Sequence, residues 1–459
     1  MNLRGIGLAV LAAATCVHAG GFRGDGTGVY PDARVSAAWN KDTKPVWQVK
    51  LPSWSNSSPV PAGDRLFVGC ETTLLMCLSA ADGTNLWQAS LAYEETLADA
   101  ERLELEGQRQ KEQAFNALRK GVVDKLNDVS RQVQNGNSKE SFAVASRLAE
   151  VSKAADEMQA RFEPTPLADK YRMPPAHGGT GYSTPTAASD GKSVWAHGGN
   201  GVLACYSFDG QRRWIRFVEK PTQGHGHASS PVLVDGRVVV AINGIHAFKA
   251  DTGEPAWRTN SAARFGTPVV TAIGGKPVVI TANGEVIRAA DGMVLASKLG
   301  GLSFNGPVVG DGVVFFANDN EVRAYRLPAE MADTLAVSQL WKAPGPGGRA
   351  YASPVCHAGL LYVASDSGKM FILDAATGEK VKEVTLQLQG ACYSSPSIAG
   401  NTLIVASEGG SVASFEAGRD CKETGRMKVD GLRSSPSIAG DRLYLRTMGG
   451  VSCFGLSGN

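Results

Sequence analysis

A short motif recurs eight times along this chain, and it limits the fold more than any other feature. Each copy is a tripeptide rich in Ser, Thr, Gly or Asn that ends in proline and precedes a short apolar strand. The prolines are Pro59, Pro185, Pro231, Pro268, Pro307, Pro354, Pro396 and Pro436. From the second copy onward the intervals are 46, 37, 39, 47, 42 and 40 residues, the period of a repeat that forms one four-stranded sheet. The repeat predicts an all-β fold, an eight-bladed β-propeller.

Turn residues and tryptophans divide each repeat into four strands. In the third repeat, Asp235-Gly236 and Asn243-Gly244 separate the first three strands. The fourth strand of a repeat carries Trp87, Trp214, Trp257 or Trp341 in four of the copies. A ring of this size buries about 150–250 Å² and suits a position between two sheets. We therefore predict that these tryptophans pack one blade against the next.

The two ends of the chain predict how the ring closes. The last repeat ends soon after its third strand, Gly450-Val-Ser-Cys-Phe454, and lacks a tryptophan strand. The segment from Pro45 to Lys50 precedes the first repeat, contains Trp47 and has no blade of its own. We expect this N-terminal strand to close the last blade, because that pairing removes an exposed sheet edge.

The repeats resemble those of the pyrroloquinoline-quinone-like (PQQ-like) β-propeller family. The clearest copies are Ala250-Asp-Thr-Gly-Glu-Pro-Ala-Trp257 and Asp374-Ala-Ala-Thr-Gly-Glu379, and the opening Phe22-Arg23-Gly24 resembles that of secreted bacterial members. The resemblance covers about residues 22–459 apart from one insertion. It implies the fold, but the family includes quinoprotein dehydrogenases, the propeller lipoprotein of the outer-membrane assembly machinery and many secreted proteins without known activity. The fold alone therefore does not select a function.

Composition and the N-terminal sequence favour an exported globular protein. Hydrophobic residues make up 43% of the chain, and a formal net charge of +2 gives no strong field for nucleic acid or an anionic membrane. Residues 1–19 combine Arg4, an apolar stretch from Ile6 to Ala14 and Val17-His18-Ala19, the pattern of a cleaved signal peptide. We expect cleavage after Ala19, a periplasmic or secreted location, and no transmembrane segment.

The cysteines leave their pairing open. Cys16 follows the apolar stretch, where a lipid would anchor the protein, but Ala13-Ala14-Thr15 departs from the usual lipidation pattern, so we expect no anchor. Seven cysteines follow residue 19, an odd number, so at least one thiol is unpaired within a monomer. Cys70 and Cys77 flank a short connection and are candidates for a disulfide; the alternative is that all seven are small core residues.

Residues 92–165 interrupt the propeller, which comprises residues 20–91 and 166–459. The insertion is rich in Ala, Glu, Lys, Gln, Arg and Leu, and its apolar residues fall at helical intervals. One apolar stripe runs from Phe115 to Val133 and a second from Phe142 to Phe162. We expect an antiparallel helical hairpin, with Ser138 as the N-cap of its second helix. One alternative is that the two apolar stripes only pack against each other or lie against the rim of the propeller; the other is that the hairpin forms a docking arm for a protein partner.

Propellers usually bind ligands at the mouth of the central channel, which the innermost strands line. The residues three positions before the repeat prolines are aromatic in five of eight copies. Equivalent positions in a ring point to equivalent places, so they predict a collar at the channel mouth, joined by nearby cations and histidines. The candidate ligand-binding residues are Tyr182, His225, His227, Arg264, Phe265, Phe304, Arg349, Tyr351, Tyr393 and Arg433. Such a collar suits a planar anion, a sugar or a peptide; the alternative is that the aromatic rings pack between blades.

The densest histidine cluster is Gly224-His225-Gly226-His227. On a strand, His-x-His places both rings on one face, a geometry that holds a metal ion when a third ligand is near. The sequence identifies no third ligand. We therefore expect a hydrogen-bonding role at the channel mouth and assign no metal site.

The resemblance also raises an enzymatic alternative. Quinoprotein dehydrogenases commonly place a disulfide between adjacent cysteines against the quinone, together with a calcium-bound carboxylate site and a catalytic aspartate. This chain has no adjacent cysteines, nucleophile elbow or phosphate loop. We expect a non-catalytic binding or scaffold protein, with no catalytic residue and no PQQ or calcium assigned. The alternatives are a quinone-dependent oxidoreductase and a role resembling the outer-membrane assembly factor.

Overall fold

The computed structural model describes residues 20–33, 39–134, 145–146, 148–153, 156–157, 164–261 and 265–456. The chain divides into two compact units. The larger unit combines Met1–Ala92 with Pro175–Asn459, and the smaller unit is Tyr93–Pro174.

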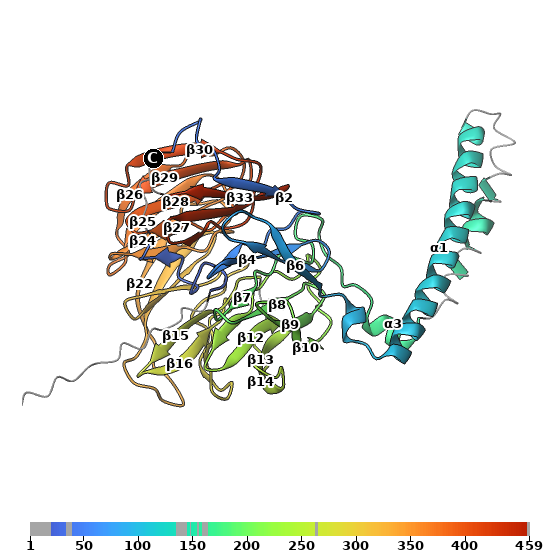
Figure 1. Ribbon diagram of the computed structural model, residues 1–459, viewed down its shortest axis with the longest axis horizontal. Helices are drawn as coiled ribbons and strands as arrows, with labels where there is room; N and C mark the ends of the chain where they lie inside the picture. The colour runs from blue at the N-terminus through green and yellow to red at the C-terminus, as the bar shows by residue number, and fades with distance from the viewer. Residues whose placement is uncertain are drawn as a thin grey trace, which may run out of the picture. The chain divides into compact units, whose positions relative to one another are not determined.

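The larger unit is an eight-bladed β-propeller of four-stranded antiparallel blades, which confirms the predicted fold (Figure 1). Blade one contains β3 (Val60–Ala62), β4 (Arg65–Cys70), β5 (Leu74–Ser79) and β6 (Asn85–Ser90), and blade two contains β7 (Ala188–Ser189), β8 (Ser193–His197), β9 (Val202–Ser207) and β10 (Arg212–Phe217). Blade three contains β11 (Val232–Val234), β12 (Arg237–Ile242), β13 (Gly244–Lys249) and β14 (Pro255–Thr259), and blade four contains β15 (Val269–Ile273), β16 (Lys276–Ile280), β17 (Val286–Arg288) and β18 (Val294–Ala296).

The second half of the ring follows the same plan. Blade five contains β19 (Val308–Gly310), β20 (Val313–Ala317), β21 (Glu321–Arg326) and β22 (Ser338–Pro344), and blade six contains β23 (Val355–His357), β24 (Leu360–Ala364), β25 (Lys369–Asp374) and β26 (Lys380–Thr385). Blade seven contains β27 (Ser397–Ala399), β28 (Thr402–Ala406), β29 (Ser411–Glu416) and β30 (Glu423–Lys428). Blade eight contains β31 (Ser437–Ala439), β32 (Arg442–Arg446) and β33 (Gly450–Gly455), and β2 (Trp47–Lys50) completes it.

Burial explains the residue pattern of a blade. Each blade lies between two others, so its second strand is covered on both faces and reads as a continuous apolar run. In β20 all five residues are buried. The outermost strand, such as β26, is mostly exposed and carries charged residues.

The ring closes as predicted. Strand β2 pairs antiparallel with β33, with Trp47 opposite Cys453, and the two strands lie side by side in Figure 1. A second N-terminal strand, β1 (Val29–Tyr30), was not predicted. It pairs in parallel with β27, at the inner edge of blade seven.

Tryptophans join one blade to the next, as predicted. Trp214 in β10 donates its Nε1–H to the carbonyl oxygen of Ala250 at 3.0 Å, and its ring lies against Gly253 of the next blade. A Cβ atom at Gly253 would lie only 2.5 Å from that ring. The same pair of contacts, a hydrogen bond and a covered glycine, joins Trp47 to Gly83, Trp87 to Gly210, Trp257 to Gly292 and Trp341 to Gly378.

A ring of hydroxyl groups links the inner edges of the blades. The backbone N–H of Ser353 in blade six donates to Ser395 Oγ in blade seven at 2.9 Å, and equivalent bonds recur around the channel. The seven accepting residues, which we call the hydroxyl ring, are Ser58, Thr186, Ser230, Thr267, Ser353, Ser395 and Ser435. Six of them directly precede a repeat proline. The repeated motif is therefore a connection between blades.

The hydroxyl ring has a gap between blades four and five, where two backbones meet. Gly306 occupies the hydroxyl position there. A Cβ atom at Gly306 would lie 2.4 Å from the carbonyl oxygen of Thr267, so a serine does not fit. Close backbone contact replaces the hydrogen bond at this one seam.

Blade two is offset from the sequence repeat by two residues. Its hydroxyl-ring residue, Thr186, follows Pro185 instead of preceding it. The first strand of the blade accordingly begins at Ala188, which pairs with Trp195. The assignment of Pro185 as the counterpart of the other seven prolines is therefore wrong, and Tyr182 does not hold a collar position.

The cysteines are core residues. All seven cysteines of the described chain are free and buried, and Cys70 Sγ lies 3.7 Å from Met76 Sδ. Burial raises the pKa of Cys392 to about 12, so this thiol stays neutral. Cys16 lies outside the described residues.

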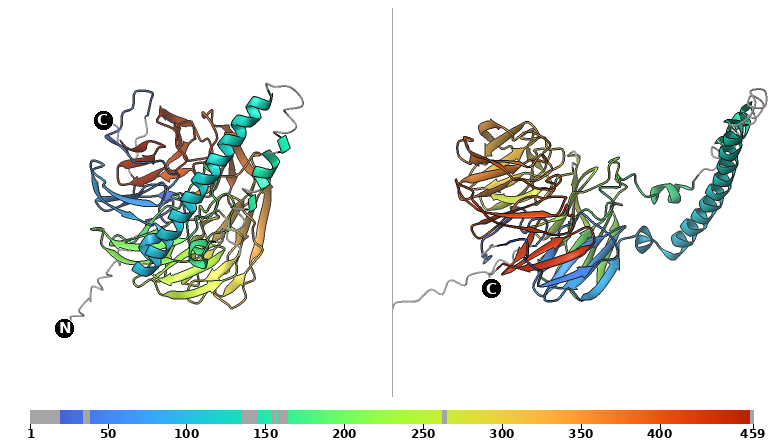
Figure 2. Two further views of the ribbon diagram at one scale, coloured as in Figure 1. Left: turned by 90° about the vertical axis from the view of Figure 1, so that its right-hand side faces the viewer. Right: turned by 90° about the horizontal axis from the view of Figure 1, so that it is seen from above.

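The smaller unit contains the 3₁₀ helix η1 (Tyr93–Thr96) and the helices α1 (Asp99–Gln134) and α3 (Pro166–Lys170). Helix α1 is 36 residues long and continuous (Figure 2), which confirms the first predicted helix. Most of the second predicted helix, including the N-cap at Ser138, lies outside the described residues; residues 145–146, 148–153 and 156–157 are helical. Among the helices of the described chain, none is long and apolar enough to cross a membrane.

Gly253→Ala tests the tryptophan contact, with Gly236→Ala as a matched control. Both glycines have φ near +70°, so alanine at either position loses roughly 1–2 kcal/mol through the left-handed backbone. An added Cβ atom at Gly236 meets nothing within 4 Å, whereas at Gly253 it meets Trp214. We expect Gly253→Ala to lower the free energy of unfolding, measured by urea denaturation, by about 1–3 kcal/mol more than Gly236→Ala does. Equal losses would show that the tryptophan contact does not hold the blades together.

Candidate functional site

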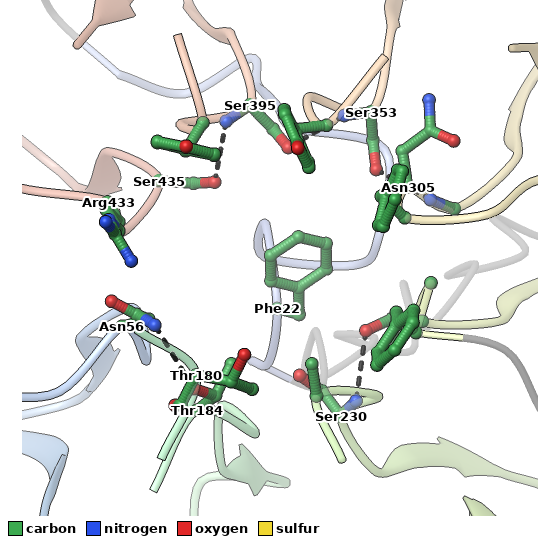
Figure 3. Close-up of a pocket in the computed structure, with 18 of the residues that line it drawn as sticks. Phe22, Asn56, Thr180, Thr184, Ser230, Asn305, Ser353, Ser395, Arg433 and Ser435 are labelled. Carbon is green, nitrogen blue, oxygen red and sulfur yellow. Dashed lines mark hydrogen bonds between the residues drawn. The ribbon is translucent and has the colours of Figure 1, made fainter. Parts of the chain in front are cut away.

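A cavity of about 830 Å³ opens at the mouth of the central channel, a size typical of small-molecule sites. Residues of the hydroxyl ring line it, together with the residues two positions before each ring position. We call the cavity the cup and this second set the collar (Figure 3). The collar residues are Asn56, Thr184, Ala228, Phe265, Phe304, Tyr351, Tyr393 and Arg433.

Four neighbouring collar residues form an aromatic arc along blades four to seven. The ring centroids of Phe265 and Phe304 are 5.9 Å apart and their planes differ by 18°. Tyr351 lies 4.7 Å from Phe304 and 4.7 Å from Tyr393. All four rings are half-buried and line the cup. The structure thus brings together four of the aromatic residues predicted for the collar.

Two predicted arginines continue the arc. The Arg433 guanidinium lies 4.8 Å from the ring centre of Tyr393 and forms an ion pair with Glu408. Arg349 donates to the Tyr351 hydroxyl at 3.0 Å, and this hydrogen bond raises the pKa of the Arg349 guanidinium. Among the described residues, Arg349 has no carboxylate partner. The arc therefore carries one arginine in an ion pair and one, Arg349, outside any ion pair of the described residues, with Asp319 and Asp366 close enough to add to the rise in its pKa.

The other side of the cup is polar. Asn56 Nδ2 donates to the carbonyl oxygen of Gly179 at 2.7 Å, which also accepts from Arg433 at 2.8 Å. The exposed rings of His177 and His225 lie 6.2 Å apart and also line the cavity. His225 thus lies at the channel mouth, where the sequence placed it.

Two predicted site residues, Tyr182 and His227, are not part of the cup. Tyr182 lines a separate small cavity, and its backbone N–H donates to Glu71 Oε1 at 2.8 Å. His227 is buried 4.9 Å from the ring of His197, and burial lowers its pKa to about 4. Arg264 lies outside the described residues.

The predicted His-x-His geometry is wrong. Residues 224–229 form a loop and not a strand, and Gly226 has φ of +94°. This conformation sends His225 to the cup and His227 into the interior. The two imidazoles therefore do not share a face.

The floor of the cup comes from a segment that sequence reasoning missed, Gly20–Tyr30, which we call the plug. Gly20 pairs with Ser189 of blade two, and β1 pairs with blade seven. Between these anchors Phe22 reaches the centre of the cup (Figure 3). The side chain of Arg23 is 1% exposed and donates to the carbonyl oxygens of Pro354 at 2.8 Å and Pro396 at 3.1 Å.

A glycine makes room for that arginine. A Cβ atom at Gly28 would lie 2.3 Å from the guanidinium of Arg23. The glycines after Phe22-Arg23 were thus the one signal in the sequence that the segment is compact. Their spacing does not reveal where it docks.

The residues of the cup do not match a calcium-bound quinone site. Calcium takes six to eight oxygen ligands, usually including several carboxylates. Asp319 is the one carboxylate among the residues that line the cup, and its Oδ1 already accepts the N–H of Ala350 at 2.8 Å. Within the described part of the chain, no group of three His, Cys, Asp or Glu side chains is placed to hold a metal ion.

Several solved structures share the fold. BamB from Moraxella catarrhalis is 12% identical, with 90% of this chain and 97% of that chain covered and a TM-score of 0.52. Quinohemoprotein alcohol dehydrogenase from Comamonas testosteroni is 10% identical, with 94% of this chain and 79% of that chain covered and a TM-score of 0.55. The computationally designed protein Ika8 is 9% identical, with 90% of this chain and 99% of that chain covered and a TM-score of 0.54. At these identities the likeness shows the fold alone.

The family is shown by the sequence. No curated protein sequence matches the chain. A family model described as outer membrane protein assembly factor BamB matches residues 31–130 and 242–457, more than half of the chain. The chain therefore belongs to the PQQ-like β-propeller family that this BamB model describes.

Proposed function

We propose that this protein is a non-catalytic binding protein that holds a small ligand in the cup. The observation that carries the proposal is the aromatic arc, which continues into Arg433 and is flanked by Arg349. Contiguous ring faces and cations at a concave site supply stacking, cation–π contact and directional hydrogen bonds. The cup therefore offers affinity without requiring a reactive group.

The collar is preformed, which supports binding. Each collar residue lies two positions before a position that is tied to the next blade by the hydroxyl ring or by close backbone contact. A site held in this way loses little conformational entropy when a ligand enters. Shape and polarity of the cup would then select the ligand.

The location and the second unit complete the proposal. The signal-like sequence of residues 1–19 supports export to the periplasm or beyond. The helical insertion is a compact unit of its own, with Leu103 of α1 71% exposed. It is our candidate for contact with a protein partner, which would make the chain a scaffold as well as a ligand-binding protein.

Two other functions remain candidates. A role in outer-membrane protein assembly is favoured by the description of the matching family model. A quinone-dependent oxidoreductase is favoured by the shared fold of the alcohol dehydrogenase alone. The cup is less suited to the second function, because it offers calcium a single, already hydrogen-bonded carboxylate.

Replacing two rings of the arc tests the proposal. The purified protein, incubated with a small-molecule extract of bacterial cells and desalted, should retain a ligand in one-to-one ratio by native mass spectrometry. Tyr351→Ala with Tyr393→Ala should weaken binding of that ligand roughly 10- to 100-fold, because two ring contacts are lost. The double Tyr→Phe variant is the control, since it keeps both rings. Loss of stability in the alanine variant without weaker binding would refute the arc as the binding surface.

Titration with pyrroloquinoline quinone tests the oxidoreductase alternative. We expect that calcium does not increase quinone binding, because the cup lacks a carboxylate set for the ion. Quinone absorbance and tryptophan fluorescence would be followed with calcium and with chelator. Saturable, calcium-dependent one-to-one binding would favour the dehydrogenase instead.

Deletion of residues 95–163 tests the scaffold role. The propeller is a separate compact unit, so we expect the deleted protein to stay folded and to keep the ligand of the cup. Affinity capture from periplasmic extract, compared between the full chain and the deleted protein, should show the loss of a specific partner. Retention of every partner would end the arm hypothesis.

A further inference from the structure

The seven hydroxyl groups of the hydroxyl ring accept hydrogen bonds but do not donate their own protons within the described part of the protein. Each hydroxyl oxygen of the ring accepts one backbone N–H, and a Ser or Thr hydroxyl also carries one proton that it can donate. Among the described residues, no hydrogen bond uses any of the seven ring hydroxyls as a donor. All seven line the cup. The fold thus presents seven O–H donors around one small cavity.

Two serines one position earlier, Ser394 and Ser434, behave differently. Ser394 Oγ donates to the carbonyl oxygen of Ser434 at 2.8 Å, and Ser434 Oγ donates to that of Arg446 at 2.8 Å. These side chains are buried outside the cup and use their protons within the protein. Ser229 Oγ, one position before Ser230, is buried without a hydrogen-bond partner among the described residues, so free hydroxyl protons are not confined to the cup. What distinguishes the ring hydroxyls is that all seven line one cavity.

The charged groups of the cup add to the excess of donors. The lining contains Arg349, Arg433 and the single carboxylate Asp319. Asp319 accepts a backbone N–H, and Arg433 is paired with Glu408 outside the lining. The Arg349 guanidinium has a phenol hydroxyl as its side-chain partner and keeps donors for a ligand. Two amide oxygens of lining residues, Asn56 Oδ1 and Asn305 Oδ1, are buried without a partner in the described part of the chain and could accept a hydrogen bond. A cationic ligand would nevertheless meet two arginines, and the seven ring hydroxyls outnumber these two acceptors.

We infer that the ligand of the cup is a small organic oxyanion, bound through carboxylate or phosphate oxygens by the hydroxyl ring and Arg349. This inference rests on the proposed function. Hydrogen bonds from hydroxyls and guanidinium to an anion are short and about twice as strong as those between neutral groups. The apolar body of the ligand packs on the aromatic arc and on Phe22, which sets the depth of the cup. Phe22 is thus a specificity-determining residue supplied by the plug.

Isothermal titration with four aromatic probes tests the inference. Phthalate and phenyl phosphate carry the two oxyanions, and benzyl alcohol and benzylamine are the neutral and cationic counterparts. We expect at least one oxyanion to bind roughly tenfold or more tightly than benzyl alcohol, and benzylamine to bind most weakly. Preference for phthalate would identify a carboxylate ligand, and preference for phenyl phosphate a phosphate ligand; both support the inference.

Arg349→Gln supplies the decisive variant. It should weaken binding of the preferred oxyanion roughly tenfold and leave binding of benzyl alcohol unchanged. Arg419→Gln is the matched control, because Arg419 is exposed and paired with Asp374 away from the cup. If benzyl alcohol binds as tightly as both acids and Arg349→Gln has no effect, the oxyanion inference is wrong and the cup remains a binding site. If none of the probes binds, the inference fails, and the retained ligand in native mass spectrometry decides separately whether the proposed function stands.

Discussion

The hydrogen bond from one blade's backbone N–H to the next blade's hydroxyl oxygen is the contact on which this molecule depends. It recurs at seven of eight seams, always between residues at the same level of the channel. At the six hydroxyl-ring residues that precede a repeat proline, the proline has no N–H of its own and holds the preceding residue extended, so the donor and the acceptor keep their directions. Because both groups lie on the inner edge, these bonds set how closely the blades approach the axis.

The binding site follows from that spacing. Two residues before the hydroxyl ring, side chains from neighbouring blades are brought within 4.7–5.9 Å of each other and form the aromatic arc. The channel inside the ring holds the plug, in which Arg23 donates hydrogen bonds to carbonyl oxygens of blades six and seven. A passage through the propeller thereby becomes a cup with Phe22 at its floor.

Features that repeat along the chain could be predicted, because their contacts follow from periodicity. The blades, the tryptophan contacts and the closure by β2 are of this kind. The proline pattern misplaces Tyr182, because the recurring contact around the channel is made by a hydroxyl group. In blade two Thr186, which follows Pro185, provides that hydroxyl. At His225 and His227 a glycine with positive φ broke the strand geometry that the pattern assumed.

The plug could not be predicted, since nothing in its sequence repeats. Arg23 bonds to residues 331 and 373 positions away, and no local rule connects such distant segments. The sequence also did not show how many hydroxyl protons are left free to donate. Adjacent serines of one motif differ in this respect, because Ser434 donates to a buried carbonyl oxygen whereas Ser435 accepts a backbone N–H and lines the cup. Both features emerge only when the eight inner strands are assembled.

A crystal of the purified protein soaked with 4-bromobenzoate gives the most direct measurement, because the anomalous signal of bromine locates the ligand without assumption. The account predicts a bromine peak over Phe22 and the aromatic arc, with the carboxylate oxygens at hydrogen-bond distance from the hydroxyl ring and Arg349. A channel without the plug, or a bromine peak only outside the cup, would contradict it.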